Sequence, residues 1–132
     1  MEKDALTYQI IGCAINVHNK MGPGWQEVIY QRCLAIELER ANLSFVREQE
    51  HVVYYDNIEV GTRRADFVVE NNVVVELKAL TALQNVHLVQ AKNYVAAYQF
   101  PKGLLINFGS KSLEYKLIFN NRTTCQKQNS QN

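Results

Sequence analysis

Three charged residues interrupt the most apolar stretch of this sequence. Asp66 precedes the apolar run 67–69, and Glu76 and Lys78 lie at the end of a second run that begins at Val73. Placing a charge in the middle of a sheet is costly unless the charge meets a partner or a metal ion. Two carboxylates and an ammonium group held together could bind a hard cation and direct hydrolysis. The residues alone leave a buried ion pair equally open.

The two apolar runs are typical of central strands, and Asn71-Asn72 joins them in a tight turn. Side chains alternate along a strand, so Glu76 and Lys78 share one face of the second strand. Leu77 points the other way, but its backbone carbonyl remains free to bind a cation.

The direction of Asp66 depends on the length of that turn. A two-residue loop pairs Asp66 with Leu77 and points it away from Glu76. A three-residue loop that begins at Glu70, or a bulge, pairs Asp66 with Glu76 on the same face. A metal site therefore requires the odd-length loop or the bulge. Asparagine tolerates the left-handed backbone conformation that such a loop needs.

The remaining elements follow from the spacing of apolar residues, which predicts helices and strands in a regular order. Helices are expected at 5–21, 25–41 and 83–99, and further strands at 45–55, 58–62, 103–108 and 113–118. This order predicts one α/β domain over residues 1–119, with a mixed, mostly antiparallel sheet flanked by helices on both faces. The polar segment 120–132 is expected to be a mobile tail.

Length and composition bound the class of protein. The chain has 132 residues, 47% of them hydrophobic, which suffices for one core. No apolar run approaches the roughly 18 residues of a membrane span, and residues 1–4 lack a signal-peptide pattern, so we expect a cytoplasmic protein without membrane contact. The net charge of +1 excludes a global basic field, so a nucleic-acid partner would need a local patch or metal ions.

Other potential ligands have plainer interpretations. The three cysteines are odd in number and none has zinc-ligand spacing, and Cys13 and Cys33 are expected in the core. His18 lies near a helix end, where a solvated side chain or one that compensates the helix dipole is expected rather than a metal ligand.

Two helices carry polar residues beside their apolar faces. Glu27 shares a face with Tyr30 and Leu34 through i, i+3, i+7 spacing, and spacing alone favours a first-turn acid that suits the helix dipole. Gln90 and Tyr94 lie one turn apart and flank an apolar stripe, so both can point towards the end of the sheet.

Taken together, these residues resemble a known family. Asp66 followed by Glu76-Leu77-Lys78 after an apolar strand resembles the signature of PD-(D/E)XK nucleases, and the order of elements matches the core of that superfamily. Residues 24–30 fit the GxxExxY pattern that names one branch, and residues 90–94 are similar to a QxxxY motif of several branches. The resemblance covers about residues 5–119. One departure is that Ala65, not proline, precedes the aspartate.

The resemblance implies a restriction-endonuclease-like fold and a site for Mg²⁺ or Mn²⁺. It implies Asp66 and Glu76 as metal ligands and Lys78 as the catalytic lysine. It also changes the interpretation of Glu27 from an acid that suits the helix dipole to an acid that completes the metal site. The implied metal ligands are Asp66, Glu76, the Leu77 carbonyl and Glu27, and Lys78 acts in catalysis with these acids. Gln90 and Tyr94 would orient the site or contact the phosphate backbone of the nucleic acid.

The expected function is a metal-dependent nuclease that hydrolyses phosphodiester bonds in nucleic acid, with DNA as the expected substrate. A phosphate-contacting rim of Arg63, Arg64, His87, Lys92 and Lys102 is expected, with scattered solvated charges as an even alternative. Two rival functions stay open. One is a non-catalytic module that retains the nuclease fold and binds nucleic acid or protein, and the other is a subunit that acts only in a larger assembly. A homodimer would suit an enzyme that cuts both strands.

Overall fold

The computed structural model describes residues 5–120, and within that range the chain forms three helices and five strands. The elements, in order, are α1 (Ala5–Met21), α2 (Glu27–Arg40), β1 (Phe45–Tyr55), β2 (Ile58–Val69), β3 (Val73–Lys78), α3 (Asn85–Tyr98), β4 (Lys102–Asn107) and β5 (Glu114–Phe119). The expected helices and most of the expected strands are confirmed to within a few residues at their ends, whereas the expected strand 58–62 and the apolar run 67–69 form one continuous strand, β2. The expected mobile tail lies outside the described residues, apart from Asn120.

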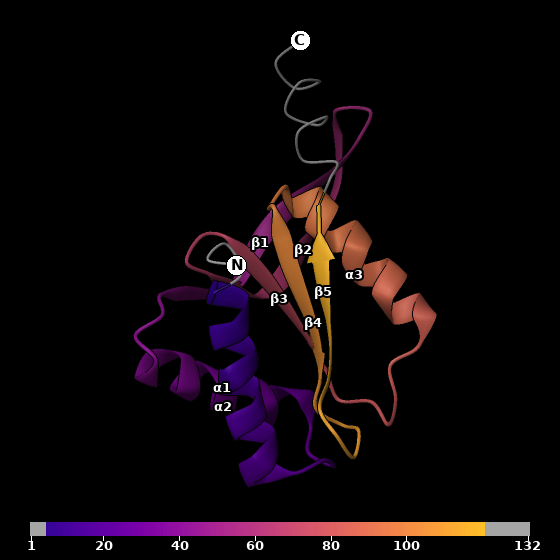
Figure 1. Ribbon diagram of the computed structural model, residues 1–132. Coiled ribbons are helices and arrows are strands. Elements are labelled where there is room, and N and C mark those ends of the chain that lie inside the picture. The colour runs from indigo at the N-terminus through magenta and orange to yellow at the C-terminus, as the bar shows by residue number, and fades with distance from the viewer. Residues whose placement is uncertain (1–4, 121–132) are drawn as a thin grey trace.

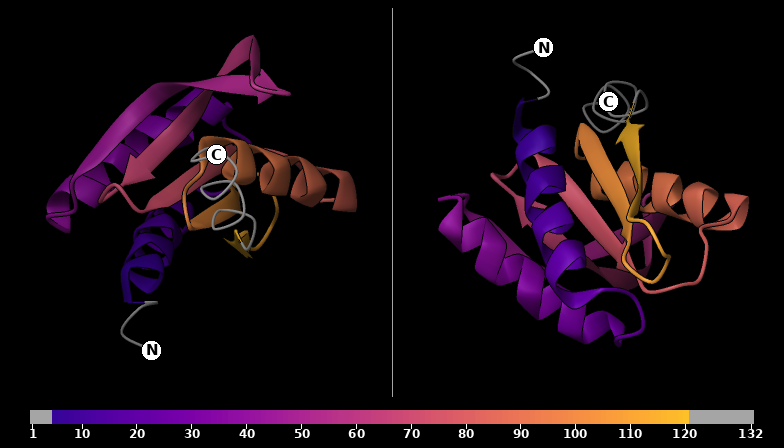
Figure 2. Two further views of the ribbon diagram at one scale, coloured as in Figure 1. Left: turned by 90° about the horizontal axis from the view of Figure 1, so that it is seen from above. Right: turned by 60° about the horizontal axis from the view of Figure 1, so that its bottom comes forward.

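The five strands form one sheet in the order β1-β2-β3-β4-β5. Neighbouring strands are antiparallel except β3 and β4, which are parallel and are connected through α3. Helices α1 and α2 cover one face of the sheet and α3 covers the other (Figure 1; Figure 2). The expected α/β fold, with a mixed and mostly antiparallel sheet between helices, is confirmed. None of the helices in the range 5–120 has the length and apolarity needed to cross a bilayer.

Two apolar cores hold the layers together. The larger core joins α1 and α2 to side chains such as Phe67, Val75 and Leu77, which are at most 1% exposed. The smaller core joins α3 to the opposite face of the sheet through residues such as Val68 and Val74. The apolar runs of β2 and β3 face both cores, which explains why they lack polar alternation.

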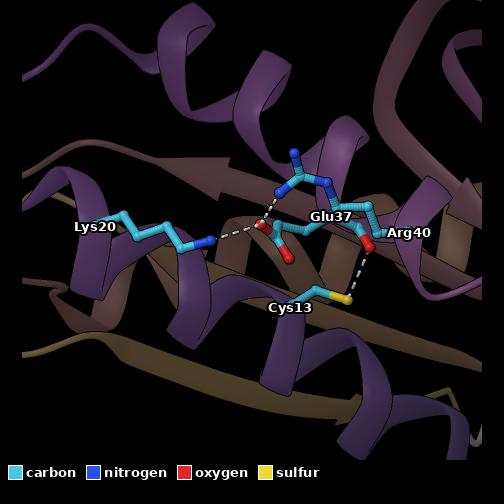
Figure 3. A network of polar contacts seen from close by, with 4 residues as sticks. All are labelled: Cys13, Lys20, Glu37 and Arg40. Atoms are coloured by element: carbon cyan, nitrogen blue, oxygen red, sulfur yellow. Dashed lines mark hydrogen bonds and ion pairs between the residues drawn. The ribbon is translucent and has the colours of Figure 1, made fainter.

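Polar contacts around Glu37 also join α1 to α2, at the border of the larger core (Figure 3). The Glu37 carboxylate of α2 forms an ion pair with Lys20 of α1 at 3.6 Å and another with Arg40 of its own helix at 3.3 Å. The buried Cys13 thiol lies 3.5 Å from the Glu37 carbonyl, so this cysteine belongs to the packed interior as expected. Cys33 packs against the same core.

The alternative of a solvated His18 was wrong, whereas its position in the last turn of α1 remains compatible with the helix dipole. Its side chain is buried, and its Nε2 lies 2.9 Å from the carbonyl oxygen of Ser110. The loop after β4 packs against the end of α1, which spacing within the helix could not reveal.

The β2–β3 connection is the three-residue loop. Val69 pairs with Val73, which leaves Glu70, Asn71 and Asn72 in the turn. Glu70 and Asn71 both have left-handed φ angles, of 53° and 49°. Continuing this register places position 66 opposite position 76, the alternative that a metal site at these residues requires.

A buried asparagine fixes the loop that follows β3. Asn107 is fully buried, and its Oδ1 accepts hydrogen bonds from the N–H groups of Leu80 at 2.8 Å and Gly109 at 3.2 Å. Its Nδ2 donates to the Leu80 carbonyl and to Glu114, both at 2.9 Å. A side chain at position 109 would lie 2.5 Å from backbone atoms of Ala79 and Leu80, so only glycine fits. This network places the chain directly after Lys78.

We expect Gly109→Ala to lower the free energy of unfolding by about 1–3 kcal/mol, because backbone atoms cannot yield to the new methyl group. The matched control is Gly12→Ala in α1, where a Cβ would meet nothing within 4 Å. That control should raise stability by up to about 1 kcal/mol through helix propensity. Chemical denaturation measures both, and equal stability of the two variants would contradict the role of this close approach.

Candidate metal centre

Strands β2 and β3 stop pairing just before the charged residues. Their last pair is Phe67 with Val75, and beyond it the Leu77 N–H donates to Asp66 Oδ2 at 2.8 Å. The N–H and C=O of one strand residue point to the same side, so the Leu77 carbonyl also faces β2. Backbone groups of successive residues point to alternate sides of a strand. Accordingly, the carbonyl of Lys78 faces the β4 side, where it accepts a hydrogen bond from the Phe108 N–H at 2.9 Å.

A local distortion directs Asp66 towards β3. Ala65 belongs to the core under α3, whereas Phe67 belongs to the core under α1 and α2. Regular alternation would place both on one face, so the strand changes face at Asp66. Across the sheet, Glu48 has a left-handed φ of 53°, and the β1–β2 pairing skips Glu48 and Asp66. The distortion turns the Asp66 carboxylate towards the Leu77 backbone.

Glu76 is a buried acid with incomplete hydrogen bonding. Its side chain is 6% exposed, and its Oε1 lies 3.5 Å from an Arg63 nitrogen. Its Oε2 is buried and finds no hydrogen-bond partner among residues 5–120. Burial above all, and then the charge of Asp66, raises the pKa of Glu76 to about 8, although Arg63 and Lys78 oppose this effect. Buried polar atoms without partners are rare, and an orphaned carboxylate oxygen fits a cation ligand.

Glu27 and Lys78 share the electrostatic environment of these acids. Glu27 lies in the first turn of α2 and is exposed on the surface. Partial desolvation and the nearby charge of Asp66 raise the pKa of its carboxyl group, and Lys78 and Arg63 act in the opposite direction. The half-buried Lys78 also lowers the pKa values of Asp66 and Glu76. Residues from α2, β2 and β3 therefore influence one another at this end of the sheet.

Two residues that sequence reasoning missed orient Asp66. Gln31, which is 6% exposed, donates from Nε2 to Asp66 Oδ1 at 3.3 Å. Its Oε1 accepts from Arg47 at 2.7 Å, so the amide links an arginine of β1 to the acid of β2. The sequence did contain a signal for Gln31. This polar residue lies one helical turn after Glu27, so the two side chains share a helix face.

The acids at this end of the sheet fit a magnesium site that water and substrate complete, rather than one built from protein ligands alone. Among residues 5–120, no three His, Cys, Asp or Glu side chains are grouped so that they could hold one ion. Mg²⁺ commonly binds one or two carboxylates and completes its coordination with waters and substrate oxygens. Asp66, Glu76 and the Leu77 carbonyl suit that donor set, while Glu27 lies at the exposed side.

The expected nucleic-acid residues fall into two groups. Arg63 and Tyr94 adjoin the acids, because Arg63 pairs with Glu76 and its Cζ lies 3.7 Å from the centre of the Tyr94 ring. Gln90 and Lys92 are exposed on α3, and Gln90 precedes Tyr94 by one turn.

The other basic residues lie apart from this pair. Arg64 is exposed and reaches Glu48 at 3.8 Å. Lys102 pairs with Val73, at the opposite end of β3 from Lys78. His87 accepts a hydrogen bond from the Gln84 N–H at 3.0 Å and so helps to cap α3.

Comparison with known proteins identifies the family. The model of the PD-(D/E)XK nuclease superfamily matches residues 4–118, so the chain belongs to that superfamily. The crystal structure of SSO0001 has a similar fold, with a TM-score of 0.55 and 19% sequence identity over 80% of this chain. The chain spans only 59% of that protein's length. No curated protein matches the sequence. The narrower resemblance to the GxxExxY branch stays a prediction.

The raised pKa of Glu76 predicts a pH-dependent stability in metal-free protein. The unfolded side chain releases its proton near 4.5, whereas the folded one keeps it until about 8. Between these values the folded state binds the extra proton, so the free energy of unfolding should fall as pH rises. Glu27 and Asp66, whose pKa values are also raised, act in the same direction.

Thermal unfolding across this pH range measures the effect. Glu76→Gln should make the decline shallower, and Glu59→Gln, at an exposed position of β2, should preserve it. A Glu76→Gln protein with the wild-type decline would contradict the assignment.

Proposed function

We propose that this protein is a metal-dependent nuclease that hydrolyses phosphodiester bonds in nucleic acid, with DNA as its substrate. Membership in the PD-(D/E)XK nuclease superfamily supports the class of reaction. The observation that carries the proposal is the orphaned Oε2 of Glu76, buried beside Asp66 and Lys78. A stable fold has no need for such a costly arrangement, whereas a cation site does.

Asp66, Glu76 and the Leu77 carbonyl would hold Mg²⁺ or Mn²⁺. Glu27 would complete the site through a water molecule, since it lies at the exposed side. When bound, the ion would polarise the phosphodiester and lower the pKa of a coordinated water. The N–H of Leu77 and the amide of Gln31 hold the Asp66 carboxylate in a fixed orientation, which limits its reorganisation during the reaction.

Lys78 would be the catalytic lysine. It projects from the same face of β3 as Glu76, two residues away, and its charge acts on all three acids. Its ammonium group would position the attacking water and stabilise negative charge that develops on the phosphate. The Asn107 network fixes the loop after Lys78 and so helps to define its position.

Nucleic acid would reach the site across α3 and the neighbouring part of β2. Arg63 and Tyr94 lie beside the acids, and Gln90, Lys92 and Arg64 extend the surface outwards. These few basic side chains would supply the local positive field that a net charge of +1 cannot give globally. A homodimer would bring two such sites to opposite strands.

A cleavage assay on DNA and RNA with Mg²⁺ or Mn²⁺ tests the proposal. We expect Lys78→Ala and Glu76→Ala each to lower the cleavage rate by about 100-fold or more, because each removes transition-state stabilisation. The matched controls are Lys20→Ala and Glu59→Ala. Lys20 pairs with Glu37 away from the site, and Glu59 is exposed near the β1–β2 turn.

The controls should cleave like the wild type. Equal cleavage by wild-type and Lys78→Ala protein would indicate a contaminating nuclease and overturn the catalytic assignment. No cleavage of any substrate, with calorimetry that detects no metal binding, would favour a non-catalytic module.

A further inference from the structure

Arg63 occupies an unusual position among the acids. Its guanidinium lies 3.5 Å from Glu76 Oε1, and its positive charge also acts on Asp66 and Glu27. Arg63 therefore influences Asp66 and Glu76, which would hold a divalent ion directly, and Glu27, which would reach it through a water molecule. A long arginine side chain and a metal ion would both neutralise this cluster.

The contact between Arg63 and Glu76 is incomplete. Charge-assisted hydrogen bonds between nitrogen and oxygen measure about 2.7–2.9 Å, and this pair is longer. Within the part of the chain that the structure describes, the buried Nε of Arg63 and the buried Oε2 of Glu76 both lack a hydrogen-bond partner. A dedicated structural ion pair would satisfy these atoms in bidentate geometry. Arg63 thus contacts one oxygen of Glu76 and leaves the other without a partner among the described residues.

The Tyr94 ring supplies a second support for the guanidinium. The Arg63 Cζ lies 3.7 Å from the ring centre, within the range of a strong cation–π contact. Tyr94 stacks in turn against Tyr98, with ring centres 6.4 Å apart, so the support belongs to the packed α3 face. Losing the Glu76 contact would therefore not release Arg63 into solvent.

We propose that Arg63 is the internal counter-ion of the metal-free site, and that a divalent ion displaces it from Glu76 while Tyr94 retains it. This inference rests on the proposed nuclease function. The displaced guanidinium, freed from a carboxylate but still beside the site, would then face a phosphate of the substrate. In this proposal the Arg63 guanidinium contacts Glu76 in the metal-free protein and a phosphate of the nucleic acid once the metal ion is bound.

Nuclear magnetic resonance of the arginine Nε–Hε groups tests the displacement in wild-type protein. Adding Mg²⁺ without nucleic acid should shift the Arg63 resonance and speed its exchange with water. The resonance of Arg64, which pairs with Glu48 instead, should stay unchanged and serves as the control. An Arg63 resonance that does not respond to saturating Mg²⁺ would overturn the proposal.

Calorimetry with Arg63→Met measures the competition directly. Affinities are compared on the alkaline plateau of the pH dependence, where a proton on Glu76 no longer competes. Removing the competing cation should strengthen Mg²⁺ binding by about fivefold, the size expected for a partly exposed ion pair. Arg64→Met should bind like the wild type. An Arg63→Met protein that is folded by circular dichroism but binds Mg²⁺ equally or more weakly would overturn the proposal.

The two proposals fail in distinguishable ways. Wild-type protein that binds no Mg²⁺ would overturn the metal-dependent function and this inference together. Wild-type protein that binds Mg²⁺ through Glu76, with an unmoved Arg63, would overturn only the counter-ion role. Should Arg63→Met not fold, the resonance experiment on wild-type protein still decides.

Discussion

The hydrogen bond from the Leu77 N–H to Asp66 Oδ2, at 2.8 Å, determines how the candidate site is assembled. It replaces a backbone ladder bond at the point where β2 and β3 separate, so a side chain takes the place of a strand partner. This exchange brings an acid of β2 beside an acid of β3 and aims a main-chain carbonyl at the same place. Without the separation, the two strands would satisfy each other's backbone groups, and the Leu77 carbonyl would not be free to bind an ion.

This arrangement carries a cost in electrostatic free energy. Three acids lie near one another, and the pKa of each is raised chiefly because burial disfavours the charged form. Repulsion by Asp66 raises the pKa values of Glu27 and Glu76 further. The protein limits the cost with Arg63 and Lys78 and with the amide of Gln31. Perturbed acids that cluster in this way are typical of functional sites, where a charge needed for chemistry is held at the expense of stability.

The sequence predicted the elements well because apolar spacing reports directly on burial. The stripe of α1, with Ile10 and Val17, and the continuous runs of β2 and β3 are buried as their patterns indicated. The register of β2 against β3 could not be chosen, because two loop lengths bury the same apolar residues.

The three-residue loop between β2 and β3 is accompanied by contacts with a residue that is distant in the sequence. The Glu70 carboxylate accepts a hydrogen bond from the Ser44 N–H at 2.7 Å, and the Glu70 N–H donates to the Ser44 carbonyl at 2.8 Å. These contacts hold Glu70 beside the residue that precedes β1, at the start of the turn. The Gln31–Arg47 pair and the burial of His18 were missed for the same reason: each depends on a partner from another element.

The left-handed residue Glu48 has a consequence for how copies of this protein behave together. Strand β1 forms one border of the sheet, where unpaired N–H and C=O groups could recruit a strand from another molecule. The kink at Glu48 interrupts that row of groups part-way along the strand. A neighbouring chain would find only short straight stretches to extend. The same irregularity that orients Asp66 therefore also protects the molecule against edge-to-edge aggregation.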